Sequence, residues 1–420
     1  MRVEAQVLID QCNRVDRCDA ASDAGAVEEP LGGGLVLRPA RPADRDRIGA
    51  LLTERGDAAD AVDHALVVDD PDAGYSSCAV VVDGSRVVST AVLLDETLHL
   101  GGVPIPTGQV ELVATDPAYE GRGLMRALID HLHRLSAARG HLVQVLLGIP
   151  YFYRLFGYQY AVDLPQARAV RGVPPSDGHH TVRRAGPADI PAMARLQEAV
   201  QSRYDLWMPH TAATWRWLVA RDGSAQLVVE RDGVVVATGR ITPAGNGGPV
   251  LGEVAATDAA GIAALLAQAL SSSEGVEVLE RPALEPFLAP RPPRAASYYV
   301  RVPDVVALLD HLRPVLSARL ATAGARGDGE VIVSFFRHHV RLRHRDGVVH
   351  EVVPGGRMQA PGAAGGAGVA PDLVAPLLFG PLGIEGMAGR HPDVYPGRDE
   401  ALMSALFPPV RADLLTFYLP

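Results

Sequence analysis

An internal repeat constrains the fold of this 420-residue sequence more than any other feature. Three short segments recur in the same order, and the related pairs are Pro42-Ala43-Asp44 and Pro187-Ala188-Asp189, Asp83-Gly84 and Asp232-Gly233, and Val113-Ala114-Thr115-Asp116 and Ala255-Ala256-Thr257-Asp258. The copies lie about 145 residues apart, whereas solenoid repeats have periods of roughly 20 to 50 residues. The sequence therefore predicts a duplicated domain.

Each copy predicts the same order of elements: a helix, a hairpin, a strand and a second helix. Proline in a first helical turn and Asp-Gly between two apolar runs are the signals for the first helix and the hairpin. The elements expected in the first copy are a helix over 42–54, strands over 78–82, 86–94, 109–115 and 142–147, and a helix over 124–138. Leucines recur along 124–138 at helical spacing, which indicates one buried face.

The expected fold class is α/β (α+β), organised in three domains. The predicted bounds are a flexible extension over 1–33, domains over 34–170 and 171–296, and a third domain over 297–420 that ends in an apolar strand, 414–419. At 48% hydrophobic residues the chain is too apolar for global disorder. No run approaches the roughly 20 apolar residues of a membrane-spanning helix, and acidic residues interrupt the N-terminal apolar run, so we expect no signal peptide.

The charge balance is acidic, with 39 basic and 49 acidic side chains and a net charge of -10. Non-specific binding of nucleic acid needs a concentrated basic face, so we expect no nucleic-acid partner, and a cationic partner suits the charge better. The three cysteines, Cys12, Cys18 and Cys78, do not have the number or spacing of a disulfide framework or a zinc site. We expect a cytoplasmic protein that does not associate with membranes.

A glycine-rich turn between the strand 109–115 and the helix 124–138 is the strongest candidate site. A helix N-terminus offers unpaired N–H groups and the positive end of the helix dipole, and both favour phosphate. Gly121 and Gly123 let the backbone approach a ligand closely, and arginines follow each of them at short range. By itself such a turn is equally typical of a plain connection. The second copy has no such turn, so we expect the first copy alone to bind a ligand there.

The segment 117–128, PAYEGRGLMRAL, resembles the acetyl-coenzyme A (acetyl-CoA) motif of the GNAT (general N-acetyltransferase) superfamily. The tandem copies followed by a third domain resemble, more narrowly, the enhanced-intracellular-survival (Eis) family. Its members have an active first GNAT domain, a degenerate second one and a sterol-carrier-protein-like third. The resemblance implies an enzyme that transfers an acetyl group from acetyl-CoA to a primary amine, such as that of an aminoglycoside or a lysine, without a metal. It also implies a homo-oligomer.

The resemblance assigns the coenzyme to the end of one strand, the glycine-rich turn and the start of the next loop. The cofactor-binding residues that it implies are Val113, Ala114, Thr115, Gly121, Arg122, Gly123, Leu124, Met125, Arg126, Gly148 and Ile149. The strand would offer backbone groups to the pantetheine arm, and the turn would hold the pyrophosphate. The sequence departs from the family pattern at Glu120 and Met125. A carboxylate beside a pyrophosphate is electrostatically unfavourable unless it points away.

Three residues are candidates for proton transfer. Tyr153, in the aromatic segment 151–158, matches the tyrosine that the family places near the coenzyme sulfur, and a phenol can protonate a thiolate of similar pKa. The resemblance assigns the general base to the C-terminal carboxylate of Pro420, although the family usually ends on an aromatic residue. Glu111, a charged residue in an otherwise apolar strand, is the alternative base. The sequence leaves this choice open.

Two further hypotheses complete the prediction. His338-His339, His344 and His350 have no carboxylate or cysteine at ligand spacing, so we expect solvated or packing histidines rather than a metal site. A protein of a different class also fits the sequence, namely a CoA-binding or lipid-binding module on the same scaffold without transferase activity. Glu120 and the expected third domain would suit that alternative.

Overall fold

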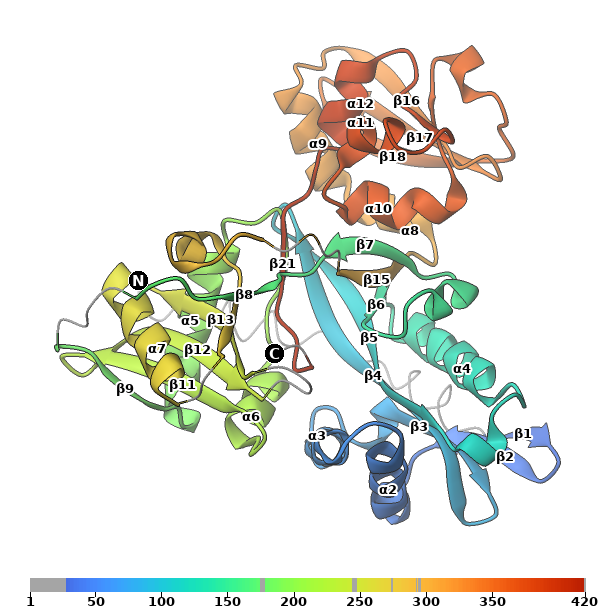
Figure 1. Ribbon diagram of the computed structural model, residues 1–420. Coiled ribbons are helices and arrows are strands. Elements are labelled where there is room, and N and C mark those ends of the chain that lie inside the picture. Colours follow the sequence, from blue (N-terminus) through green and yellow to red (C-terminus); the bar gives the residue numbers. More distant parts are fainter. Residues whose placement is uncertain are drawn as a thin grey trace, which may run out of the picture.

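The structure is a computed structural model that describes residues 28–173, 178–243, 248–272, 275–291, 293 and 296–418. Within these residues the chain forms three β-sheets, of ten, six and five strands, each with helices packed against it (Figure 1). Most strands and helices of each unit come from one stretch of the sequence, and the three stretches follow one another along the chain. The mixed α/β class that the sequence predicts is therefore confirmed.

The first sheet has the strand order β1-β2-β3-β4-β5-β6 before strands from elsewhere join it. The bounds are β1 Glu29–Gly32, β2 Leu35–Pro39, β3 Cys78–Asp83, β4 Arg86–Leu100, β5 Val103–Thr115 and β6 Val143–Leu146. Its helices are α2 Arg45–Arg55, α3 Ala58–Val68 and α4 Leu124–Ala138. Alternate side chains of β3 point to opposite faces, so Val80 packs with α2 and α3 whereas Val81 packs with α4.

Strands from distant parts of the sequence complete the first sheet. β15, Ser297–Arg301, lies between β6 and β7, Gln159–Asp163, and is antiparallel to both. β10, Leu206–Met208, pairs with the end of β4 and with β21, Ala412–Leu414. Segments that the sequence places in the second and third domains thus belong to the first sheet, because pairing between strands far apart in the chain leaves no local pattern to read.

The second unit repeats the plan of the first. Its strands are β8 Ala167–Ala169, β9 Thr181–Arg184, β11 Ala225–Arg231, β12 Val234–Thr242, β13 Val250–Ala256 and β14 Glu277–Leu279, and its helices are α5 Ile190–Gln201, α6 Ala212–Ala220 and α7 Ala259–Ser272. The Arg38 guanidinium donates two hydrogen bonds to Asp44, at 2.6 and 3.0 Å. Arg183 makes the same paired contact with Asp189, at 2.7 and 2.8 Å. The repeated Pro-Ala-Asp signal therefore marks the same ion-paired helix start in both copies.

The third unit packs helices against a five-stranded sheet of order β18-β17-β16-β19-β20. Its strands are β16 Asp328–Ser334, β17 His339–Arg345, β18 Val348–Gly355, β19 Ala367–Val369 and β20 Val394–Tyr395, and its helices are α8 Val305–His311, α9 Arg313–Thr322, α10 Val374–Phe379, α11 Gly383–Ala388 and α12 Glu400–Leu406. Its apolar core continues into the first sheet, because Val300 of β15 and Val162 of β7 belong to the same buried cluster as Phe379. The unit is therefore anchored to the first sheet (Figure 1).

Both ends of the described chain differ from the prediction. Residues 29–32, expected to be flexible, form β1, which pairs with β2, while residues 1–27 lie outside the described part. The strand expected over 414–419 is instead the short β21, which ends at Leu414. Beyond it, the carbonyls of Thr416 and Phe417 accept hydrogen bonds from the Arg240 guanidinium, both at 3.1 Å, instead of from a neighbouring strand.

Candidate active site

A cavity of about 590 Å³ opens between the end of β5 and the start of α4. Most of the predicted cofactor-binding residues line it, namely Val113, Ala114, Thr115, Gly121, Gly123, Leu124, Met125, Arg126 and Ile149. The predicted proton donor Tyr153 lines it too, with its aromatic neighbours Phe152 and Phe156. Arg122, Gly148 and Glu111 are not among the lining residues. The structure thus gathers residues from four separate segments of the first unit around one space.

The cavity exists because β5 and β6 separate. Their parallel pairing joins only residues 107–109 of β5 to β6 and ends where Gln109 faces Val145. Shortly beyond that point a bulge interrupts the pairing of β5 with β4, and Leu112 adopts the left-handed φ of 49°. A bulge bends the strand that carries it and increases its twist. The backbone of 113–115 consequently leaves the neighbouring strand and borders the cavity instead.

The glycine-rich turn closes the cavity at the start of α4. Gly121 and Gly123 have φ values of 74° and 80°, a region that side chains with a Cβ rarely adopt. A Cβ at either position would meet no protein atom within 4 Å, so the space beside the turn is open. The first turn of any α-helix leaves its N–H groups without intrahelical acceptors. Here these groups belong to Leu124, Met125 and Arg126, which all line the cavity.

Two charged residues of the turn are committed to protein contacts. Arg122 donates to the Ala118 carbonyl at 3.1 Å and lies over the Tyr119 ring, which explains why it is not in the lining. Glu120 does line the cavity, and its carboxylate accepts a hydrogen bond of 2.7 Å from Arg55 at the end of α2. The carboxylate that the sequence marks as unfavourable therefore has its own cationic partner, which lines the same cavity.

Tyr153 is held with its ring almost wholly buried, at 6% exposure. It packs edge-on against Phe152 and Tyr158. A Cβ on Gly148 would lie 2.2 Å from the Tyr153 ring, so only glycine permits this approach. Gly148 thus supports the cavity by letting Tyr153 into it. Burial, assisted by the Glu111 carboxylate, raises the pKa of Tyr153 to about 12, so the phenol stays protonated at physiological pH.

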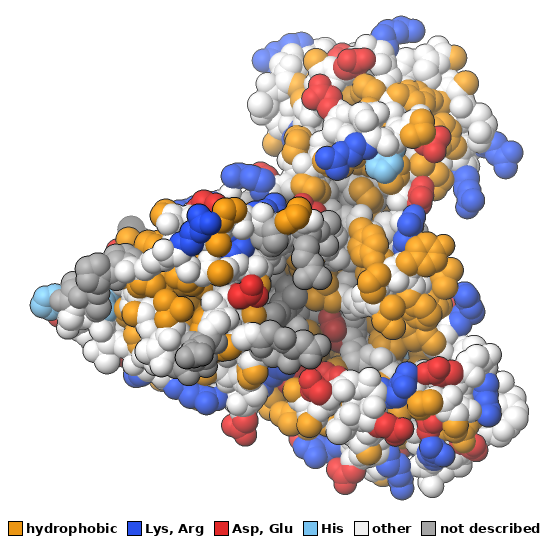
Figure 2. Space-filling view, in the orientation of Figure 1, with side chains coloured by type: hydrophobic (Ala, Val, Ile, Leu, Met, Phe, Trp, Pro, Cys, Tyr) orange, Lys and Arg blue, Asp and Glu red, His pale blue; other side chains and the backbone are white. Residues whose placement is uncertain are grey.

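Apolar side chains are exposed on the surface of the first unit in the segment that contributes to this cavity. Figure 2 shows them gathered over the part of the first unit where Figure 1 places the loop that follows β6. The exposed large apolar residues of the loop after β6 and of β7 are Ile149, Tyr151, Leu155 and Tyr160, at 66%, 64%, 56% and 40% exposure, and of these Ile149 and Leu155 line the cavity. Elsewhere on this face arginine and acidic side chains are interspersed, so the face carries no extended basic patch of the kind that grips nucleic acid (Figure 2).

Glu111 is buried in β5, on a part of the strand that does not line the cavity. Burial raises its pKa to about 8, although its carboxylate accepts a hydrogen bond of 2.6 Å from Gln109. Gln109 also donates to the Thr416 hydroxyl at 2.8 Å, which joins β5 to the C-terminal segment. Glu111 is therefore linked through Gln109 to Thr416 of the C-terminal segment, and it lies close enough to Tyr153 to affect the pKa of Tyr153.

Other acidic groups surround Glu111. Burial, with nearby Asp95 and Glu111, raises the pKa of Glu96 to about 8, and burial raises that of Asp63 to about 6 despite its ion pair with Arg221. Oε2 of Glu96 and Oδ1 of Asp63 are buried without a hydrogen-bond partner among the described residues. Buried polar atoms normally have partners, so these oxygens indicate a place for water or for a ligand that donates hydrogen bonds.

The raised carboxyl pKa values make stability depend on pH. A carboxyl whose pKa is raised from its ordinary 4.5 to about 8 holds its proton more tightly in the folded chain. Its contribution to stability is therefore complete below the ordinary value and is lost as the pH rises through about 8. Between pH 4.5 and about 8, we expect the unfolding free energy of the wild type to fall as the pH rises. In Glu111→Gln the slope of this fall should be smaller, by up to about 1.4 kcal/mol per pH unit.

Urea unfolding of the wild type and the variant at several pH values measures this slope. Glu54→Gln, which changes an exposed glutamate of α2, is the matched control and should leave the slope unchanged. Parallel stability curves for wild type and Glu111→Gln would contradict the raised pKa.

The C-terminal segment reaches this region because the second unit holds it. Arg240 is fully buried, donates to Glu253 at 2.6 Å and also donates to the carbonyls of Thr416 and Phe417. Burial opposes ionisation of Glu253, but Arg240 and His210 outweigh it and hold the pKa of Glu253 at about 2. Leu419 and Pro420 lie outside the described residues, so the predicted role of Pro420 stays a prediction.

In the second unit, protein side chains occupy the places that border the cavity in the first. At the start of α7 the Asp258 carboxylate accepts a hydrogen bond of 2.8 Å from the Gly261 N–H. Beside the bulge of β13, Arg281 donates to the Val254 carbonyl at 3.0 Å and forms an ion pair of 2.8 Å with Asp413. A carboxylate at a helix N-terminus takes the position that an anion would need.

The first unit matches a known family. Residues 60–161 match the family described as acetyltransferase (GNAT) domain, and they contain the bulged strand, the glycine-rich turn and Tyr153. The chain contains a GNAT acetyltransferase domain. The chain also resembles curated relatives, the N-acetyltransferases Eis of Mycobacterium bovis and Mycobacterium tuberculosis, at 40% identity over 86 residues. The match spans 19% of this chain and 21% of the length of each relative.

Solved structures resemble the chain beyond the GNAT domain. A GCN5-related N-acetyltransferase from Anabaena variabilis aligns with a TM-score of 0.65 at 14% identity, covering 89% of this chain and 97% of that one. A GCN5-related N-acetyltransferase from Kribbella flavida gives 0.61 at 18% identity, over 91% and 100% of the two chains. Eis1 from Mycobacterium abscessus gives 0.59 at 15% identity, over 90% and 99%. At these identities the likeness concerns the fold, and it extends through all three units.

Two other sequence predictions bear on the site. In the described part of the chain, no three histidine, cysteine, aspartate or glutamate side chains gather as ligands for a metal ion. No helix among the same residues has the length and apolar character needed to cross a membrane.

Sequence reasoning missed Arg55, Arg240 and Glu253. For Glu253 a signal existed, since it is a lone acidic residue in the apolar strand β13, as Glu111 is in β5.

Proposed function

We propose that the chain is an N-acetyltransferase that uses acetyl-CoA and acetylates a cationic primary amine. The observation that carries the proposal is the cavity between β5 and α4, where a diverging strand and a glycine-rich helix start face one open space. The free backbone edge of 113–115 suits an amide-containing arm such as pantetheine. The first turn of α4, with Arg126 and Arg55, suits a pyrophosphate.

The acceptor would lie on the side of β5 where Glu111 is buried. Carboxyl oxygens of Glu96 and Asp63 there have no hydrogen-bond partner among the described residues, and an ammonium group supplies both the charge and the donors that they lack. A neutral acceptor would supply no positive charge to these buried carboxyl groups. This supports a cationic amine, and the net charge of -10 would attract such a molecule at long range.

The reaction would be a direct transfer. The amine loses a proton to a base, its nitrogen forms a bond to the thioester carbonyl carbon, and the carbon–sulfur bond breaks. Tyr153, whose raised pKa keeps its hydroxyl protonated, gives its proton to the departing thiolate. Glu111, with a pKa near 8, could accept the amine proton close to neutral pH, and the C-terminal carboxylate of Pro420 is the other candidate base.

Three further parts of the proposal concern the remaining units. The second unit, residues 171–296, would be a GNAT domain that has lost its coenzyme site, and Asp258 and Arg281 would account for the loss. The third, residues 297–420, would be the sterol-carrier-protein-like domain. A homo-oligomer stays a prediction from the resemblance.

The proposal is tested with the full chain in two steps. Acetyl-CoA should raise the melting temperature, and release of free thiol should require both acetyl-CoA and an amine, with polyamines and aminoglycosides better than uncharged amines. Glu111→Gln and a one-residue extension beyond Pro420 then separate the two candidate bases, because each change removes one of them. Acetyl-CoA that neither stabilises the chain nor is consumed with any amine would overturn the proposal.

The Arg55–Glu120 pair gives a prediction about coenzyme affinity. Glu120→Gln removes a negative charge from the cavity and releases Arg55 toward the phosphates, so we expect the Kd for CoA to fall about threefold at low salt. Calorimetry at two salt concentrations measures this change. Glu29→Gln, in the comparable surface pair with Arg134, should have no effect. Weaker binding by Glu120→Gln would mean that Glu120 instead positions Arg55.

A further inference from the structure

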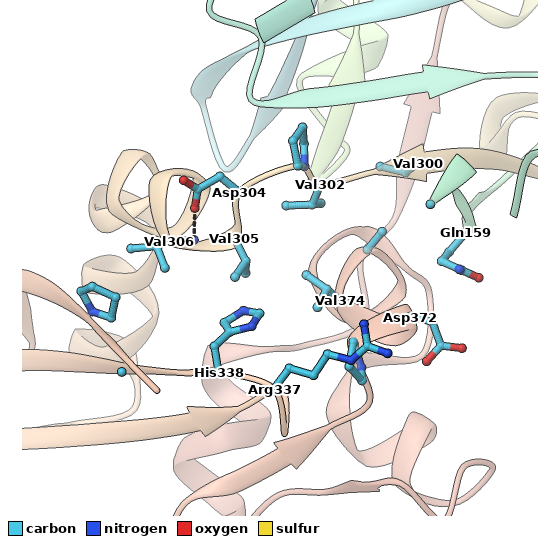
Figure 3. Close-up of a pocket in the computed structure, with 16 residues that line it drawn as sticks. Gln159, Val300, Val302, Asp304, Val305, Val306, Arg337, His338, Asp372 and Val374 are labelled. Carbon is cyan, nitrogen blue, oxygen red and sulfur yellow. Dashed lines mark hydrogen bonds between the residues drawn. The ribbon is translucent and has the colours of Figure 1, made fainter. Parts of the chain in front are cut away.

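A second cavity, of about 670 Å³, lies between the first sheet and the third unit. Its walls come from β7, β15, the start of α8, the connection from β16 to β17, the end of β18, and α10 with the residues before it (Figure 3). It shares no lining residue with the cavity beside α4. Its volume falls within the range of about 300 to 1,000 Å³ typical of sites for small molecules.

One side of this interdomain cavity is apolar. Valine side chains line it, and they are Val300 of β15, Val302 just after β15, Val305 and Val306 of α8, and Val374 of α10 (Figure 3). Val300, Val305 and Val374 are buried, at 0%, 8% and 8% exposure, so they form a fixed wall. A hydrocarbon chain laid on this wall would be removed from water, and this favours binding in proportion to the apolar area that is buried.

The opposite side carries a cation. Arg337 and His338 extend from the connection between β16 and β17 toward the valines (Figure 3). Among the described residues, neither the Arg337 guanidinium nor the His338 ring has a hydrogen-bond or ion-pair partner. The acidic lining residues are engaged: Asp304 accepts from the N–H groups at the start of α8, at 2.9 and 3.0 Å, and Asp372 lies 3.9 Å from Arg154.

Hydrogen bonds fix the backbone immediately before this pair of residues. Phe336, immediately before them, has the unfavourable φ of 60° for a residue with a side chain. Its N–H donates to the Ser334 hydroxyl at 3.0 Å, and its carbonyl accepts from the Met358 N–H and the Gln359 side chain. Strained residues that are fixed from several sides cluster at functional sites. The His338 ring also packs against buried Phe335, with ring centroids 5.3 Å apart.

We infer that the interdomain cavity binds an amphipathic monocarboxylate, a medium-chain fatty acid. Its carboxylate would pair with the Arg337 guanidinium, aided by a nitrogen of His338, and its chain would lie on the valine wall. One guanidinium and one imidazole match a single carboxylate in number and geometry. The wall disfavours small polar anions, which have nothing to place on it. The inference does not depend on the proposed acetyl transfer, since the two cavities have separate linings.

Equilibrium dialysis of the full chain with radiolabelled decanoate tests the inference, with saturating acetyl-CoA present to exclude binding at the other cavity. Butyrate and decanol serve as competitors that lack the chain and the charge. We expect saturable binding of decanoate, and competition by butyrate and decanol at least tenfold weaker than by unlabelled decanoate. Arg337→Gln should weaken binding about tenfold or more, and Val302→Asp should abolish it.

Arg390→Gln, which changes an exposed arginine of the third unit outside the cavity, is the matched control and should bind like the wild type. Circular dichroism and melting temperature check that each variant is folded. Decanol that competes as well as unlabelled decanoate, or an Arg337→Gln variant with unchanged affinity, would overturn the carboxylate assignment. Absence of saturable decanoate binding would overturn the site itself. Thiol release by the same preparations shows independently whether acetyl transfer holds.

Discussion

Tyr153→Phe should lower kcat by about 10² to 10⁴-fold while leaving the KM for acetyl-CoA nearly unchanged. The substitution removes only the hydroxyl, and general acid catalysis typically contributes a factor of this size. The ring would keep its edge-on contacts with Phe152 and Tyr158, so the wall of the cavity should stay as it is. Steady-state rates of thiol release with one cationic amine measure both constants.

Tyr151→Phe is the control for this experiment. Tyr151 lies two positions away in the same segment, is 64% exposed and does not line the cavity, so its hydroxyl should be dispensable. Gly148→Ala provides a second check, because its Cβ would meet the Tyr153 ring at 2.2 Å and must displace it. We expect a loss of kcat comparable to that of Tyr153→Phe. A Tyr153→Phe enzyme with full kcat would show that water, not this phenol, protonates the thiolate.

Sequence reasoning located the cavity beside α4 because all its walls lie within one stretch of the chain. The helix 124–138 is observed as α4 with the expected bounds, and nine of the eleven predicted cofactor-binding residues line the cavity. Glycines at positive φ and a helix start are local features, so a local motif can encode them. Arg122 stays a predicted cofactor-binding residue, and nothing local in the sequence indicates that its side chain turns back to the Ala118 carbonyl.

What the sequence could not indicate are the contacts between units. β15 enters the first sheet from far along the chain. The short β10 and β21 pair with each other although nearly half of the chain length separates them, and no motif in either segment indicates the pairing. The buried arginines Arg240 and Arg281 are likewise ordinary strand and loop residues in the sequence. Their partners, Thr416, Phe417 and Asp413, belong to the C-terminal segment. Only the folded arrangement shows that the second unit holds this segment against β5.

Arg240→Met should destabilise the chain by about 3 to 5 kcal/mol. Arg240 and Glu253 form a buried ion pair with a contact of 2.6 Å, and removal of one partner leaves the other charge buried with less compensation. The variant also loses both hydrogen bonds to the C-terminal segment. Urea unfolding measures the change. Carboxypeptidase digestion under native conditions should in addition remove C-terminal residues from the variant faster than from the wild type.

The double variant Arg240→Met/Glu253→Leu distinguishes a charge effect from a packing effect. When both partners of a buried ion pair are replaced by apolar side chains, the protein loses much less stability than the sum of the losses in the two single variants. The double variant should therefore be more stable than additivity predicts. Arg345→Met, in the surface pair with Asp328, should show no measurable loss because both side chains are largely exposed. Strict additivity, or equal digestion of wild type and Arg240→Met, would contradict the assignment of Arg240 as the residue that holds the C-terminal segment beside Glu111.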